Sequence, residues 1–181
     1  MKKGKTGTRN AAFWLLLVSG ALTAGICLVM NLWLIPAIEG HAGGLRVFDM
    51  RSFGYTPAEG RAFLTALDEE GTALYLTRQL PLDFLYPAAY TAFFVLLLRR
   101  LFAGRTLLCL SPLLLTFADL TENVCSILLL RQGNGSDLLL GVASTATLIK
   151  SVLMAAVFLL LLVGIVRSFL RRTHKKITGN A

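Results

Sequence analysis

Four long apolar stretches dominate the sequence and restrict it to one class of fold. A bilayer core of about 30 Å needs roughly 20 apolar residues in a helix that rises 1.5 Å per residue. Because no water reaches backbone groups inside lipid, each stretch is expected to be a helix. The four stretches cover residues 11–35, 82–98, 107–130 and 138–166.

The pattern predicts an all-α, polytopic membrane protein: one membrane domain over residues 1–181, built as a four-transmembrane-helix bundle. Composition agrees, because 55% of the residues are hydrophobic and only 15% are charged. Soluble domains carry about 25% charged residues. A disordered chain, a disulfide scaffold and a water-soluble globule are therefore excluded. Residues 36–80 form the one long connection, and residues 167–181 form a tail after the last span.

Basic residues predict the orientation of the bundle. Both termini are expected in the cytoplasm, because basic flanks stay on the cytoplasmic side of an inner membrane. The other connections hold five basic residues and seven acids. The basic segments lack aromatic residues in a nucleic-acid-binding arrangement, so they predict contact with anionic lipid and no nucleic-acid partner. Twelve of the 18 basic residues lie in segments without any acid: Lys2, Lys3, Lys5, Arg9, Arg99, Arg100, Arg105, Arg167, Arg171, Arg172, Lys175 and Lys176.

The extracytoplasmic connection 36–80 is expected to carry one short helix. Thr56-Pro57-Ala58-Glu59 has the pattern of a capping box with proline at the first helical position. It predicts a helix over 57–70, with Gly71 as its C-terminal stop. The helix is amphipathic, and it either caps the bundle at the membrane surface or forms a lid over a site. Its apolar face holds Phe63, Leu64 and Leu67.

Ionisable side chains within membrane spans are costly, and they usually face a bundle interior or a watery cavity. Asp119 and Lys150 each lie about 12 residues inside a span, roughly 18 Å deep, so both are expected near the midplane and paired. Glu122 and Asn123 share one helix face with Asp119. Asp83 lies near the outer boundary of its span.

These residues predict a polar cavity that opens outward and is closed toward the cytoplasm. Asp119, Glu122 and Lys150 form its expected charged centre. Three intramembrane acids face one base, so a fully ionised set would carry a charge of −2. We therefore expect a protonated carboxyl, an arginine from the loop or a bound cation. The ligand- or proton-binding candidates at the mouth are Asn31, Asp83, Tyr86, Tyr90 and Asn123.

Other kinds of site find little support in the sequence. Cys27, Cys109 and Cys125 all lie in spans, without a CxxC pair, and the chain has only two histidines. A thiol oxidoreductase and a zinc site are therefore not predicted. No phosphate-binding glycine loop or GxSxG nucleophile is present. No metal and no cofactor are expected.

Three functional hypotheses remain open. In the first, the pocket binds or helps move a polar or cationic small molecule, a lipid headgroup or a proton, and so short a chain is expected to dimerise with itself to alternate access. In the second, the protein is an intramembrane enzyme acting on a lipid or isoprenoid, with Asp119 and Glu122 dividing the acid and base roles. In the third, it is a structural or assembly subunit, and its buried polar contacts only set helix register. The sequence alone does not decide whether the protein is an enzyme.

Overall fold

The computed structural model describes residues 4–133 and 135–178, and no strand occurs in those ranges. Four of its continuous helical segments are long and apolar enough to cross a membrane. They cover Asn10–His41, Glu69–Leu101, Thr106–Gln132 and Asp137–Arg171. The chain is therefore a multi-pass membrane protein with an all-helical bundle, as the apolar stretches predict.

The first helical segment does not stop at Pro36, and the sequence prediction of an end at residue 35 was wrong. It consists of α1 (Gly4–Val29), a π-helical turn η1 (Met30–Leu34) and α2 (Ile35–His41). Proline lacks the N–H that a helix interior needs. The wider turn directly precedes it, and there the Ile35 N–H donates to the carbonyl of Met30. The helix thereby continues past the proline.

The second helical segment repeats this arrangement, so it starts far earlier than the predicted residue 82. It consists of α4 (Glu69–Leu74), a π-helical turn η3 (Tyr75–Gln79) and α5 (Leu80–Leu101), with Pro81 at the second position of α5. The turns η1 and η3 contact each other. Short π-helical turns inside α-helices are frequent at functional sites, and Met30 and Asn31 of η1 line the cavity described below.

The last two segments are α6 (Leu110–Gln132), which follows a 3-10 turn η4 (Thr106–Cys109), and α7 (Asp137–Thr178). The connection after α6 begins at Gly133, whose φ of 67° is in the left-handed region that glycine tolerates. Helix α7 runs twelve residues past the predicted end at 166, through most of the segment expected to be a separate tail. No proline or glycine interrupts that segment before residue 179, so nothing local ends the helix.

The long connection contains a 3-10 turn η2 (Phe48–Met50) and α3 (Pro57–Ala66). The Thr56 hydroxyl accepts from the Glu59 N–H, and the Glu59 carboxylate accepts from the Thr56 N–H at 2.7 Å. Helix α3 ends four residues before the predicted residue 70. The correction has a local cause, because Asp68 starts α4 by accepting the Gly71 N–H at 2.7 Å. Gly71, the predicted stop, lies inside α4.

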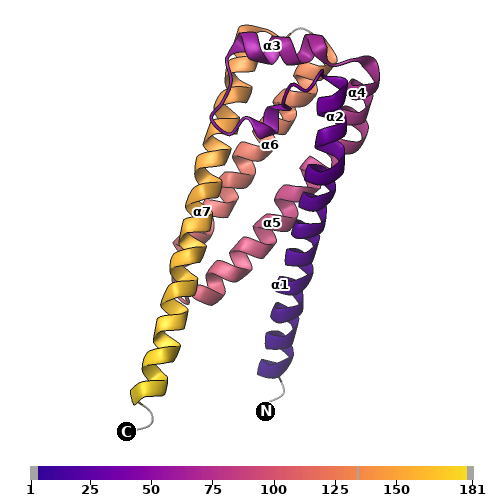
Figure 1. The fold of residues 1–181 in the computed structure, drawn as a ribbon. Coiled ribbons are helices and arrows are strands. Elements are labelled where there is room, and N and C mark those ends of the chain that lie inside the picture. The colour runs from indigo at the N-terminus through magenta and orange to yellow at the C-terminus, as the bar shows by residue number, and fades with distance from the viewer. Residues whose placement is uncertain (1–3, 134, 179–181) are drawn as a thin grey trace.

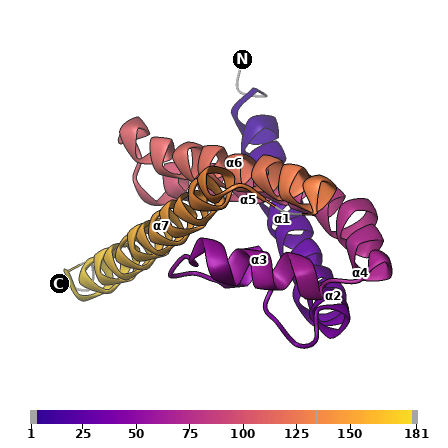
Figure 2. The ribbon, with the colours of Figure 1, turned by 90° about the horizontal axis from the view of Figure 1, so that it is seen from above.

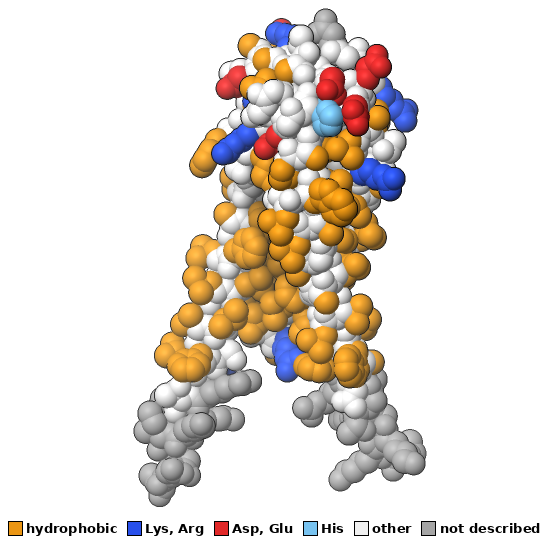
Figure 3. Space-filling view, turned by 45° about the vertical axis from the view of Figure 1, so that its right-hand side comes forward, with side chains coloured by type: hydrophobic (Ala, Val, Ile, Leu, Met, Phe, Trp, Pro, Cys, Tyr) orange, Lys and Arg blue, Asp and Glu red, His pale blue; other side chains and the backbone are white. Residues whose placement is uncertain are grey.

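Helix α6 packs against α7 and α5, and α5 packs against α1. Figure 1 shows α1 and α7 diverging on either side of α5, with the described ends of both helices at the end of the bundle opposite α3. Seen from above, α3 lies beside the bundle between α7 and α2 (Figure 2). Figure 3 shows charged side chains gathered at the α3 end and apolar side chains along the helices below.

Candidate functional site

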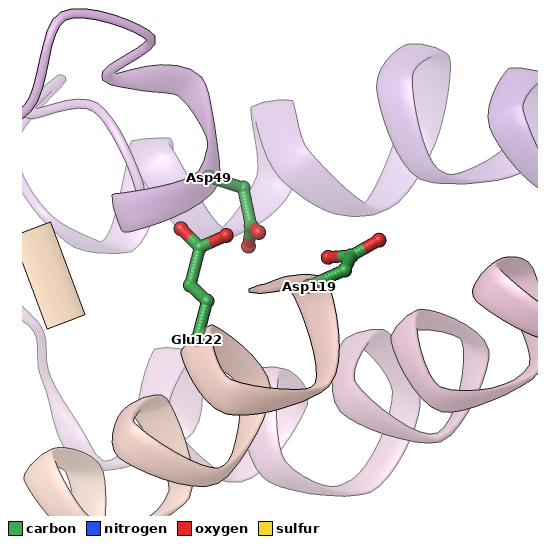
Figure 4. A group of neighbouring side chains, drawn as sticks. All are labelled: Asp49, Asp119 and Glu122. Carbon is green, nitrogen blue, oxygen red and sulfur yellow. The ribbon is translucent and has the colours of Figure 1, made fainter. Parts of the chain in front are cut away.

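A buried lysine contacts three carboxylates where η2 meets α6 and α7. The Lys150 ammonium lies 2.8 Å from Asp49 Oδ1 and 3.3 Å from Asp119 Oδ1, and it also contacts Glu122 Oε2. Figure 4 shows the three carboxylates converging, one from η2 and two from α6. We call these four residues the ion cluster. Glu122 is fully buried, and the other three are nearly so.

The local sequence explains how the ion cluster assembles. Asp119 and Glu122 are three residues apart on α6 and therefore share a face. That face packs against α7, which supplies Lys150. The structure thus brings together the three residues that the sequence suggested as the charged centre. Sequence reasoning missed Asp49, which it counted only as a charge of the external loop.

The neighbours of Asp49 offered a signal. It lies between Phe48 and Met50, and Val47 precedes them. In an external loop, a lone acid within an apolar run is more consistent with a buried turn than with a solvated one. Phe48 is fully buried in the core beneath the loop, and this anchors the turn that directs Asp49 at Lys150.

Each acid of the ion cluster also accepts a hydrogen bond from a hydroxyl. Tyr75 donates to Asp49 Oδ2 at 3.2 Å, and Tyr90 donates to Asp119 Oδ2 at 3.0 Å. Thr147 on α7 donates to Glu122 Oε1 at 2.5 Å. Such donors stabilise the buried charges and hold the carboxylates in place. Tyr75 and Thr147 were not among the predicted site residues.

The charges of the ion cluster do not balance. Burial raises the pKa of Asp49, but the attraction and hydrogen bond of the Lys150 ammonium outweigh it and leave that pKa below its ordinary value of 3.8. Asp49 is thus an anion at neutral pH. Carboxylate oxygens of all three acids lie within 4.8 Å of one another. One ammonium cannot neutralise three carboxylates, so a proton or a second cation is needed to offset the remaining repulsion.

Asp83 lies outside the ion cluster, on α5. Both oxygens of its carboxylate accept from Gln79 Nε2, at 3.1 and 3.2 Å. No Lys or Arg of the described residues lies within 4 Å of it. Asp83 is 5% exposed and lines the cavity described next. It is therefore a buried acid without a cationic partner in the part of the chain that the structure describes.

A cavity of about 580 Å³ adjoins these groups, between η1 and the start of α2 on one side and α7 on the other. Asp49, Asp83, Asp119 and Lys150 form its polar end. Its remaining walls are largely apolar, and Ser52 and Phe53 of the turn that follows η2 line it on the loop side. The residues that complete its lining are Met30, Asn31, Ile35, Met50, Ser52, Phe53, Tyr86, Leu148, Ser151, Val152, Met154, Ala155 and Phe158.

Of the eight predicted site residues, five line this cavity: Asn31, Asp83, Tyr86, Asp119 and Lys150. Glu122 and Tyr90 are each 0% exposed and lie behind the cavity wall. There Glu122 contacts Lys150, and Tyr90 donates to Asp119. Asn123 does not line the cavity and is 1% exposed.

Asn123 instead satisfies a backbone group of α5. Its amide donates to the carbonyl of Asp83 at 2.7 Å. That carbonyl would accept the N–H of the residue four positions later, which is Pro87 and has none. Asn123 therefore replaces a missing helical hydrogen bond between two packed helices. Its role in the structure is to position α5.

The three carboxylates of the ion cluster have the geometry of a site for a hard cation. The Lys150 ammonium contacts all three of them and so takes the place that such a cation would occupy. The cluster is thus a lysine-filled carboxylate site. Its members Asp49, Asp119 and Lys150 line the cavity together with Asp83.

No protein-family model, curated protein or solved structure matches the chain.

Proposed function

We propose that the protein is a small multi-pass protein of the inner membrane that binds a polar, positively charged ligand group in the cavity between η1 and α7. The observation that carries the proposal is the surplus of acids at one end of an otherwise apolar cavity. Asp49, Asp83 and Asp119 line that end, and Lys150 is its one base among the described residues.

The charge surplus favours a cation for an electrostatic reason. Two unit charges 4 Å apart interact by about 4 kcal/mol at an effective dielectric constant of 20 and by about 1 kcal/mol in water. Asp83 has hydrogen bonds from Gln79 but no cationic partner within 4 Å among the described residues. A protonated amine beside Asp83 and Asp119 would supply the missing charge and up to three N–H donors. An anionic ligand group would add to the repulsion already present.

The basic residues support an orientation with both termini in the cytoplasm. The described ends of α1 and α7 lie at the same end of the bundle, so one side of the membrane suits both (Figure 1). A reporter enzyme active only in the cytoplasm, fused after Ala181, is expected to be active. Activity of a periplasm-specific reporter at that position would reverse the orientation.

Binding can be tested by thermal unfolding of the full chain in phosphatidylcholine nanodiscs, with a series of amines from butylamine to dodecylamine. A ligand at a hundred times its Kd stabilises the folded state by about 2.7 kcal/mol. We expect at least one amine to raise the melting temperature. The shift should shrink in Asp83→Asn and Asp119→Asn, which keep the side-chain shape but remove a carboxyl group that would pair with the ammonium.

Asp137→Asn is the matched control. Asp137 is 73% exposed and pairs with Arg61 beside α3, away from the cavity. The control should keep the full shift. The proposal is wrong if no amine stabilises the protein, or if all three variants respond equally.

A further inference from the structure

The cavity has two chemically different parts. From Lys150 the wall continues along α7 through Val152, Met154, Ala155 and Phe158. Eight residues of helix correspond to about 12 Å, so the apolar part extends well beyond the acids. Met30 and Ile35 form the opposite wall. A compact, water-soluble cation would use only the acidic end and leave this apolar length empty.

The apolar part is open toward the side of the bundle. Helix α1 packs on α5 and α7 packs on α6, while α1 and α7 diverge (Figure 1). Val152 is 62% and Phe158 56% exposed, although both line the cavity. In a multi-pass protein, exposed apolar side chains at this level face lipid chains. The cavity therefore communicates with the lipid phase between α1 and α7.

Defined contacts hold the loop beside the acidic end of the cavity, where Ser52 and Phe53 belong to the lining and Phe53 is 97% exposed. Asp49 in η2 is held by Lys150 and Tyr75. The Tyr55 N–H donates to Ser144 Oγ at 2.8 Å, which ties the following residues of the loop to α7. Entry between α1 and α7 leaves these contacts intact.

The acids also lie at a level suited to a lipid-borne headgroup. The loop covers the outer turns of α7, because Leu140 packs against Gly60 of α3 and Ser144 bonds to Tyr55. Lys150 is 17 residues before Arg167 on α7, about 26 Å of helix. With Arg167 at the inner surface of a core of about 30 Å, Lys150 lies near the outer surface. On this reasoning Lys150 lies farther out than the midplane depth that we expect from the sequence.

We infer that the ligand is a single-chain amphiphile with a protonated amine, which enters from the outer leaflet between α1 and α7. Its ammonium lies against Asp83 and Asp119, and its chain lies along Val152, Ala155 and Phe158. This inference rests on the proposed function and names its ligand class. A volume of about 580 Å³ lies within the range of about 300–1,000 Å³ typical of small-molecule sites.

The test uses the full chain in phosphatidylcholine nanodiscs and a dodecylamine that carries a photoreactive diazirine near the end of its chain. Probes of the same length with an alcohol or a carboxylate head are the comparators. Mass spectrometry identifies the labelled peptides. We expect the amine to label η1 and the α7 segment 152–158 more strongly than either comparator. Asp83→Asn should weaken that labelling.

Ala155→Trp fills the apolar wall, while Leu159→Trp adds the same ring at a residue that is 62% exposed and outside the cavity lining. Labelling should fall about tenfold in the first variant, because an overfilled wall cannot admit the chain, and stay unchanged in the second. If Ala155→Trp does not fold, Val152→Trp, at an exposed position of the same wall, replaces it.

The possible failures are distinguishable. Equal labelling by all three heads, or no effect of Ala155→Trp, overturns the inference. If short butylamine then still stabilises the protein and depends on Asp83 and Asp119, the cavity binds a water-soluble cation and the proposed function stands. If no amine of any length depends on these acids, both proposals fail.

Discussion

Replacement of Lys150 by methionine tests the ion cluster most severely. Methionine fills a similar volume, but it leaves three carboxylates within 4.8 Å of one another without their shared ammonium. Removing one partner of a buried ion pair costs about 3–5 kcal/mol. The hydroxyl donors Tyr75, Tyr90 and Thr147 remain, so the acids stay hydrogen-bonded. We therefore expect a loss of about 3–5 kcal/mol in the free energy of unfolding.

The assay is steric trapping of the unfolded state in dodecylmaltoside, which reports the free energy of unfolding of a membrane protein directly. Arg61→Met is the control, because its pair with Asp137 is 39% and 73% exposed. Exposed pairs contribute at most about 1 kcal/mol. A loss for Lys150→Met no larger than that of Arg61→Met would refute the argument.

A rescue separates charge from packing. Adding Asp119→Asn and Glu122→Gln to Lys150→Met removes two of the three unpaired charges and retains the side-chain shapes. Since replacing a whole buried ionic group by neutral residues is often tolerated, the triple variant should recover more than half of the lost stability. A triple variant as unstable as the single variant would show that the methionine disrupts packing, and that the carboxylates do not repel one another as argued.

Three further predictions address the framework around the site. Asn123→Leu leaves the Asp83 carbonyl without its donor and should lower the free energy of unfolding by about 1–3 kcal/mol. Adding Pro87→Ala should restore part of that stability, because alanine returns a backbone N–H to α5. Unchanged stability of Asn123→Leu alone would contradict the role of Asn123 in positioning α5. Gly71→Ala should lower the free energy of unfolding by about 1–3 kcal/mol, because a Cβ there would lie 2.5 Å from His41 Cβ. Gly40→Ala is the control, because a Cβ there meets nothing within 4 Å and should be neutral or stabilising. Equal melting temperatures of the two variants would exclude the tight contact at Gly71. The Gly71 N–H lowers the pKa of Asp68, and the Thr56 N–H lowers the pKa of Glu59. The two ionised carboxylates therefore stabilise the fold fully above the ordinary carboxyl pKa. This stabilisation is lost as the pH falls through the lower pKa values that the two groups have in the folded protein. Asp68→Asn with Glu59→Gln should flatten the decrease in melting temperature between about pH 5 and pH 3, and an unchanged slope would refute this.

The membrane class and the four spans could be predicted from the sequence, because the length and hydropathy of a span depend only on its local composition. Helix ends were less predictable where a local change in the backbone or a side-chain cap sets the residue at which the helix begins or ends. The first span was predicted to end at residue 35 and the second to begin at residue 82. In each case a π-helical turn close to a proline lets the helix continue. The end of α3 moved because Asp68 starts a new helix, which competes with the extension toward Gly71.

The site was predictable only where helical periodicity sets the geometry. Asp119 and Glu122 are three residues apart and therefore share a helix face. Lys150 is the one base within the predicted spans, and an unpaired charge in a membrane is costly, so its contact with these two acids could be predicted. Asp49 could not be placed in this way, because a loop residue 70 positions before Asp119 in the sequence has no periodic relation to it. Asn123 was misread as a mouth residue, because its partner is a backbone carbonyl freed by a proline on another helix.

The most direct test of the central claim is a structure of the full chain in lipid with 12-bromododecylamine, in which bromine marks the end of the chain. We expect bromine between α1 and α7, near Phe158, and the amine nitrogen at hydrogen-bond distance, about 3 Å, from the carboxylates of Asp83 or Asp119. An empty cavity at saturating amine, or an amine bound elsewhere while the ion cluster stays unchanged, would contradict it.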